Sequence, residues 1–136
     1  MLVVVSDLHL GDGSTASSIP ANAFHLFANR LRETAYFASF RRDGTYKPIG
    51  SLTLLLMGDI LDPLHSTLWL DSAPGAVGYT RPWTSFTSPF FASKLEQTTQ
   101  AIIEGNKESL EVLRRFATGE TILLPPANER GEPDHD

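Results

Sequence analysis

The chain has 136 residues, of which 41% are hydrophobic, and it carries a net charge of −5. This composition is typical of a folded domain with an ordinary core, and the acidic balance argues against broad electrostatic binding to nucleic acid or to an anionic membrane. The sequence has no cysteine, which excludes disulfides, thiolate zinc sites and cysteine nucleophiles. No stretch has the pattern of a signal peptide or the roughly 20 apolar residues of a membrane span, so we expect a cytoplasmic protein.

The first predicted element is a strand over residues 2–5, followed by Ser6-Asp-Leu-His-Leu-Gly-Asp-Gly13. A short β-branched run bounded by a glycine-rich segment is typical of a buried strand of an α/β sheet. Asp7 and His9 follow at its carboxyl end. Because residues two apart on an extended chain point the same way, we expect this carboxylate and this imidazole to converge on one point.

A crossover helix is predicted next, beginning near Ser18 or Asn22, either of which can cap a helix. His25, near the start of this helix, is expected to face solvent or the preceding loop rather than a metal. Residues 41–48 form a basic, turn-rich connection that we expect at the surface. The predicted core face of the helix has apolar residues at steps of three and four, namely Phe24, Phe27, Ala28, Leu31, Ala35 and Ala38.

The second predicted strand, residues 52–57, ends in the same way as the first, with Gly58-Asp-Ile-Leu-Asp62. Nearly all strand-helix-strand units are parallel and right-handed, so both strands present their motifs at one edge of the sheet. In open α/β sheets this carboxyl edge is where ligands bind. We therefore expect the side chains of Asp7, His9, Asp59 and Asp62 to be neighbours.

Residues 63–92 are rich in Pro, Gly, Ser, Thr and aromatic residues, and they predict a loop-rich insertion. Such a long loop is either a surface insertion held by its aromatic residues or a segment that shapes a substrate pocket. Its chemically notable residues are His65, Trp69, Arg81 and Trp83. Arg81 is the candidate for a phosphate contact, because a guanidinium matches phosphate geometry.

A long helix is predicted from the capping-box sequence Ser93-Lys-Leu-Glu96 to the basic pair before Gly119, with a bend or a division at Gly105-Asn106. Residues 120–124 predict a third strand, and residues 125–136 predict a polar tail. The expected core residues of the helix are Leu95, Ile102, Ile103, Leu110, Leu113 and Ala117.

The Asp7-x-His9 and Gly58-Asp59-x-x-Asp62 motifs resemble the first two motifs of the calcineurin-like metallophosphoesterases, and the stretch around Asp7 is similar to the bacterial branch in particular. The resemblance implies an α/β fold in which two β-sheets form a sandwich flanked by helices. It also implies a centre of two divalent ions such as Mn, Fe or Zn. By this resemblance Asp7 and His9 hold the first metal and Asp59 bridges both, while Asp62 is no ligand but orients a histidine of the next motif.

The residue types agree with this chemistry independently. Two cations a few ångströms apart need a bridging carboxylate, and oxygen and imidazole ligands suit Mn, Fe or Zn. The function that the resemblance implies is a metal-dependent hydrolase that cleaves phosphodiester or phosphomonoester bonds with metal-activated water. A phosphodiester, a nucleotide or a pyrophosphate lipid is the expected class of substrate.

The third family motif departs from the pattern. The family places Gly-Asn-His after its third strand, whereas this chain has Pro125-Pro-Ala-Asn-Glu-Arg-Gly131. Asn128 matches the family's asparagine ligand of the second metal, but Glu129 stands where the histidine general acid is expected. The later family histidines have no counterpart unless His135 folds back. We therefore expect a truncated domain over residues 1–124, followed by the tail.

These departures leave a second hypothesis, in which the chain is a catalytically inactive fragment or an interaction module that retains the first half of the fold. Half of a sandwich leaves a sheet edge exposed, so we also expect a homo-oligomer, a complementing chain or poor solubility. A phosphate-binding Rossmann-type domain is the weaker alternative, because Gly11-x-Gly13 lacks the third glycine and an immediate helix.

Overall fold

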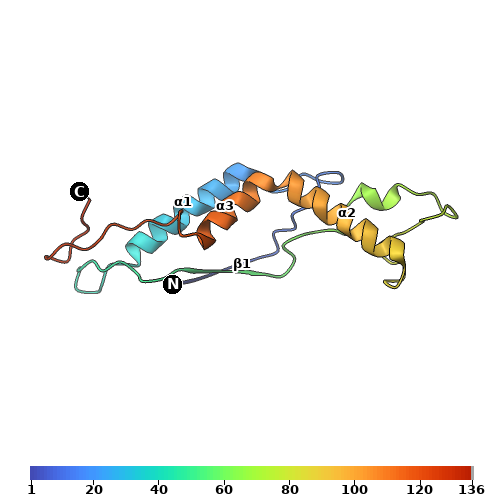
Figure 1. Ribbon diagram of the computed structural model, residues 1–136. Helices are drawn as coiled ribbons and strands as arrows, with labels where there is room; N and C mark the ends of the chain where they lie inside the picture. The colour runs from blue at the N-terminus through green and yellow to red at the C-terminus, as the bar shows by residue number, and fades with distance from the viewer. Residues whose placement is uncertain (136) are drawn as a thin grey trace. The chain divides into compact units, whose positions relative to one another are not determined.

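The computed structural model describes residues 1–135 as a mixed α/β structure (Figure 1). The chain folds into two compact units. The first unit comprises Met1–Val5, Ala21–Leu56 and the chain from Glu108 onward, and the second comprises Ser6–Pro20 and Met57–Lys107. The elements of the described chain are β1 (Leu2–Ser6), α1 (Ala21–Phe37), β2 (Thr53–Met57), the 3₁₀ helix η1 (Thr67–Leu70), α2 (Pro89–Gly105) and α3 (Lys107–Ala117).

The strands β1 and β2 pair in parallel as a two-stranded sheet, as the sequence predicts for its first two strands. The prediction that the first strand is buried is wrong, since Leu2 and Val4 are 64% and 52% exposed while Val3 and Val5 are half-buried. Figure 1 shows α1 and α3 on the same side of β1. One face of the strand is therefore covered and the other is open.

Helix α1 confirms the predicted crossover helix and most of its core face. Phe24, Ala28, Leu31 and Ala35 are buried, and the ring of Phe27 packs edge-on against Phe116 of α3 at 6.0 Å. Ala38 lies just beyond the helix and is exposed. Neither predicted cap has that role, because Asn22 lies inside the helix and the Ser18 hydroxyl bonds to Gly11.

Residues 120–124 do not form the predicted third strand. The chain leaves α3 through Gly119, which has a φ of +74°, and the amide of Glu120 turns back to donate to the carbonyl of Arg115. The tail then packs on the 41–48 connection instead of extending the sheet. Tyr46 is buried there, with its amide donating to Gly131 at 2.6 Å and its hydroxyl to Pro125 at 3.0 Å.

Helix α2 begins four residues before the predicted capping box, at Pro89 after the cap Ser88. Proline at the first helical position is well suited to a helix start because its missing N–H would have no partner there. The predicted division at Gly105-Asn106 is confirmed. The side-chain amide of Asn106 donates to the carbonyls of Ile102 at 2.8 Å and Gly11 at 2.7 Å, so the break also fastens the loop after β1.

The predicted core of this helical region is confirmed only in part. Ile102 is fully buried, whereas Ile103 is 41% exposed and Ala117 is exposed. The insertion over residues 63–92 is held by aromatic residues: Trp69 is buried against Phe91, with ring centroids 5.6 Å apart, and its indole donates to the carbonyl of Pro63. Trp83 by contrast is 79% exposed.

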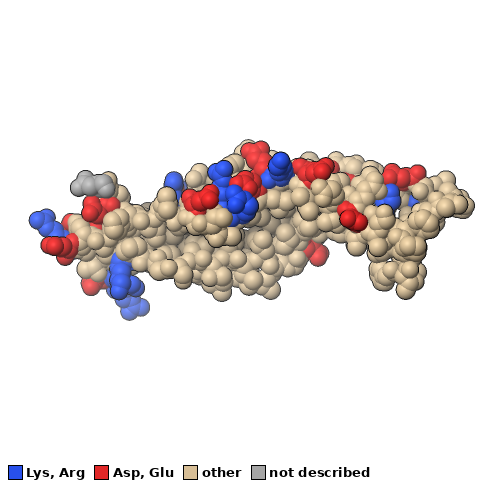
Figure 2. Space-filling model, viewed as in Figure 1, with Lys and Arg blue, Asp and Glu red and all other residues tan. Residues whose placement is uncertain are grey.

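Figure 2 shows basic and acidic side chains interspersed over α1 and α3 on the face in view. Local ion pairs on these two helices include Arg30 with Glu33 and Arg114 with Glu111. In the part of the chain that the structure describes, no helix is long and apolar enough to cross a membrane.

Candidate metal centre

The segments that follow the two strands stay side by side beyond the sheet. His9 donates its amide to the carbonyl of Asp59, Leu10 donates to Ile60, and Asp62 donates back to Leu10, each at 2.9 Å. Leu10 is completely buried and forms a parallel bridge with Leu61. These bonds fix the register of the two predicted motifs against each other.

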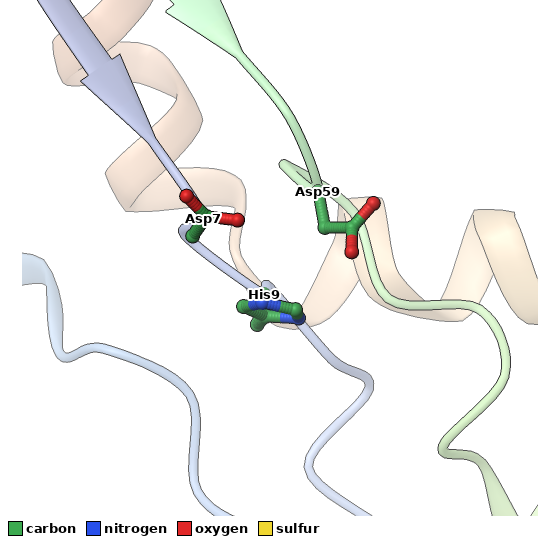
Figure 3. Close-up of side chains that lie close together, drawn as sticks. All are labelled: Asp7, His9 and Asp59. Carbon is green, nitrogen blue, oxygen red and sulfur yellow. The ribbon is translucent and has the colours of Figure 1, made fainter.

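This register brings Asp7, His9 and Asp59 together, as the sequence predicts (Figure 3). One ligand atom from each residue lies within 4.8 Å of the others, and all three side chains are exposed. Metal–ligand bonds of about 2.0–2.2 Å hold any two ligand atoms at most about 4.4 Å apart. Small rotations of exposed side chains are enough to close that difference, so the residues fit one divalent cation.

The backbone conformation of the first motif differs from the extended chain that the sequence predicts. Asp7 and His9 are not extended: their φ angles are +55° and +46°, in the left-handed region. This conformation costs about 1–2 kcal/mol per residue for a side chain with a Cβ. Such backbone strain is concentrated at functional sites, where the surrounding structure holds it in place.

Gly58 supports the same geometry from the second motif. Its φ is +69°, and a Cβ placed there would lie 3.3 Å from Oδ1 of Asp7. Glycine therefore serves two needs at this position, because it adopts the left-handed backbone without strain and leaves space for the Asp7 carboxylate.

Asp62 lies beside two histidines. Its Oδ2 is 2.7 Å from Nδ1 of His65 and 3.7 Å from Nδ1 of His9, and its Oδ1 accepts the amide of His65 at 3.3 Å. Burial disfavours the charge on Asp62, but the hydrogen bonds from His65 outweigh it and hold the pKa of the carboxyl below 3.8. The expected supporting role of Asp62 remains a prediction, and its nearest partner is a histidine of its own loop.

A cavity of about 510 Å³ opens beside this pair. His9, Asp62 and His65 line it together with Leu8 and with small, hydroxyl and aliphatic residues of the loop over residues 11–19. The volume is within the range of small-molecule sites in proteins.

Arg81 lies within the insertion, and its role as a phosphate contact remains a prediction. Its side chain is buried, and the guanidinium donates to the carbonyls of Trp69, Thr80 and Ser72 while it stacks on the ring of Tyr79 at 4.4 Å. A guanidinium bonded to three carbonyls stabilises the insertion, and we assign Arg81 that structural role.

Asn128 belongs to the first unit, whereas Asp7, His9 and Asp59 belong to the second. Its side-chain oxygen accepts the amides of Arg130 and Glu132, both at 2.9 Å, and so closes its own turn. The assignment of Asn128 as a metal ligand remains a prediction. His135 packs on Tyr36 within the first unit, with ring centroids 6.4 Å apart.

Sequence reasoning missed the polar residues that hold the site loop. Asp12 accepts hydrogen bonds from the amide of Ser14 at 2.9 Å, from the Ser14 hydroxyl at 2.6 Å and from the hydroxyl of Ser66. The Asp-Gly-Ser sequence is a signal for this turn, because aspartate commonly bonds the backbone two residues on. The bond to Ser66, 54 residues away, has no sequence signal.

Comparison of the chain with protein-family models, with curated proteins and with solved structures finds no match.

Proposed function

We propose that this chain is a metal-dependent hydrolase of phosphate esters in which Asp7, His9 and Asp59 hold a divalent cation. The observation that supports the proposal is the clustering of three ligand atoms within 4.8 Å, contributed by two segments that are some 50 residues apart in the sequence. Two carboxylates and one imidazole are ligands that suit Mn, Fe or Zn.

The electrostatics of the cluster favour a cation. Two exposed carboxylates held close together repel each other, and a divalent ion between them reverses this repulsion. When bound, such an ion supplies the charge that polarises a phosphoryl oxygen and lowers the pKa of a water molecule. In this proposal Asp62, whose Oδ2 lies 3.7 Å from Nδ1 of His9, supports the orientation of that imidazole, as carboxylates beside metal-binding histidines generally do.

The residues around the cavity favour a phosphodiester over a phosphomonoester. Asp62 lines the cavity, and neither lysine nor arginine is among its lining residues. A diester carries one negative charge, whereas a monoester near neutral pH carries up to two and meets more repulsion from carboxylates. The proposed substrate class is therefore a phosphodiester small enough for a cavity of about 510 Å³.

The test is a calorimetric titration of the chain with manganese. We expect about one ion per chain, and we expect Asp59→Asn to weaken binding at least about tenfold because a charged ligand is lost. Asp43→Asn is the matched control, since Asp43 is an exposed aspartate that bonds only within its own turn at Thr45. The same proteins are then assayed for hydrolysis of bis-p-nitrophenyl phosphate with and without manganese.

Equal manganese affinity in the native chain and in Asp59→Asn contradicts the proposed site. Binding without any hydrolysis contradicts the proposed reaction. In that case the second candidate function, an interaction module, is favoured. The observation that supports it is the exposure of apolar side chains on the two strands of the first unit, namely Leu2, Val4 and Leu55.

A further inference from the structure

We propose that His65, held by Asp62, is the proton donor to the leaving oxygen of a phosphodiester bound in the cavity of about 510 Å³. This inference rests on the proposed function and deepens it. It assigns a catalytic residue to the loop after β2 and a positioning role to Asp62.

The imidazole of His65 has one nitrogen fixed and one available. A carboxylate accepts hydrogen bonds, so the 2.7 Å contact places a proton on Nδ1, between the ring and Oδ2 of Asp62. Nε2 is then the nitrogen that can meet a substrate, and it has no hydrogen-bond partner among the described residues. The side chain is 77% exposed and lines the cavity, so a ligand can reach this nitrogen.

The backbone around His65 is hydrogen-bonded to the loop that follows the first motif. Its carbonyl accepts the hydroxyl of Thr15 at 2.9 Å, the hydroxyl of Ser66 donates to Asp12, and the amide of Thr67 donates to the hydroxyl of Ser14 at 2.9 Å. Three successive residues of the loop are thus bonded to the loop over residues 12–15. These hydrogen bonds therefore fix the position of the segment that carries His65.

His65 also lies close to the candidate metal ligands. Oδ2 of Asp62 is within 3.7 Å of Nδ1 of His9 and within 2.7 Å of Nδ1 of His65, so the two imidazoles are neighbours across one carboxylate oxygen. Both line the same cavity. A phosphodiester with its phosphorus near His9 can therefore direct an ester oxygen toward His65.

The proposed step conserves atoms and charge. The oxygen of a water molecule forms a bond to phosphorus and loses a proton to solvent, while the bond from phosphorus to the leaving oxygen breaks. His65 enters this step as the imidazolium, with one proton on Nδ1 toward Asp62 and the other on Nε2. The leaving oxygen takes the electron pair of the broken bond and the Nε2 proton and departs as an alcohol, which leaves a neutral imidazole with its proton on Nδ1. His65 then recovers a proton from solvent.

The choice of leaving group tests this role. An alkoxide is a poor leaving group that needs a proton, whereas p-nitrophenolate leaves without one. We expect His65→Gln to slow manganese-dependent cleavage of the dinucleotide thymidylyl-thymidine by about 10²–10³-fold. The same variant should slow hydrolysis of bis-p-nitrophenyl phosphate less than about fivefold. Asp62→Asn should likewise slow cleavage of the dinucleotide more than hydrolysis of bis-p-nitrophenyl phosphate, but its loss on the dinucleotide should be smaller than that of His65→Gln. The control is His25→Gln, an exposed histidine of α1 that pairs with Glu108.

Two readouts do not depend on activity. Long-range ¹⁵N–¹H NMR spectra of the metal-free chain, recorded with His65 in its neutral form, should show the remaining proton on Nδ1, and Asp62→Asn should lose this preference. The manganese affinity of His65→Gln should stay within about twofold of the native value, because His65 is not among the three clustered ligands.

The outcomes separate this inference from the function on which it rests. If Asp59→Asn abolishes hydrolysis but His65→Gln slows both substrates equally, or slows neither, the proton-donor role is overturned while the proposed function stands. If the native chain neither binds manganese nor cleaves either diester, both proposals fail. Native-like tautomer spectra in Asp62→Asn overturn the positioning role of Asp62.

Discussion

The two compact units of this chain are stabilised in different ways. In the first unit most buried residues are apolar, with α1 contributing Phe24, Ala28, Leu31 and Ala35. In the second unit, which contains the candidate site, a buried apolar core is accompanied by a larger set of buried polar residues, namely Ser66, Thr80, Arg81, Thr98 and Asn106. Apolar burial stabilises without regard to direction, whereas hydrogen bonds fix the direction of a side chain.

Because of this difference, substitutions in the two units should have different effects. Truncation in the first unit should lower the free energy of unfolding through lost burial and an unfilled cavity. Loss of a buried polar contact in the second unit should leave partners unsatisfied and disturb the loops that carry His9 and His65.

Leu31→Ala should have the largest effect, because Leu31 is 5% exposed in the core face of α1. We expect a loss of about 3–4 kcal/mol in the free energy of unfolding, measured by urea denaturation followed by circular dichroism at 222 nm. Leu26→Ala is the matched control, since Leu26 lies on the same helix and is 57% exposed. Similar losses in the two variants would contradict the assignment of the α1 core face.

Arg81→Met should have the next largest effect. The substitution keeps an apolar side chain but removes the donors to the carbonyls of Trp69, Thr80 and Ser72. We expect a loss of about 2–3 kcal/mol, because hydrogen bonds to a charged group are strong and buried carbonyls are left without a partner.

Tryptophan fluorescence is the suitable probe for this change, because Trp69 and Trp83 both lie in the second unit. Arg30→Met serves as the control, since Arg30 is an exposed arginine whose partner is Glu33. A fluorescence transition in Arg81→Met that coincides with that of the native chain would show that the guanidinium does not stabilise the insertion.

Asp12→Asn should have the smallest effect, about 1 kcal/mol at pH 7, because the amide that replaces Oδ2 cannot accept from Ser66. Burial opposes the charge on Asp12, but hydrogen bonds from Ser14 and Ser66 hold the pKa of its carboxyl below 3.8. A lowered pKa in the folded chain means that this stabilisation is complete above about pH 4 and is lost as the pH falls through the folded value. The difference between the native chain and Asp12→Asn in urea midpoint should therefore shrink as the pH falls from about 4 toward 3. A difference that stays constant over this range would contradict the charged hydrogen bond.

The sequence predicted those features that depend on local pattern. The three- and four-residue spacing of Phe24, Ala28 and Leu31 was sufficient for α1, and the two strand-end motifs were sufficient to place Asp59 beside Asp7 and His9. Both follow from periodicity and from the shared edge of parallel strands.

The remaining features depend on partners that are distant in the sequence. Residues 120–124 have the composition of a strand but pair with no neighbour, and a strand exists only through its neighbours. Arg81 has the chemistry of a phosphate contact, yet three carbonyls of its own loop hold it. The left-handed backbone of Asp7 and His9 has no signal in the two residues themselves, and the amide of His9 bonds to Asp59 of the distant second motif.

Gly58 has a consequence for how this site can evolve. Its hydrogen faces Oδ1 of Asp7, and a methyl group in the same place would meet that oxygen at 3.3 Å on a backbone with a φ of +69°. Aspartate ligands can be exchanged for other acidic or amide residues in successive tolerated steps, but no gradual series leads from glycine to a larger residue here. Among descendants of this chain, loss of the glycine should therefore mark lineages in which the carboxylates no longer serve a common ion.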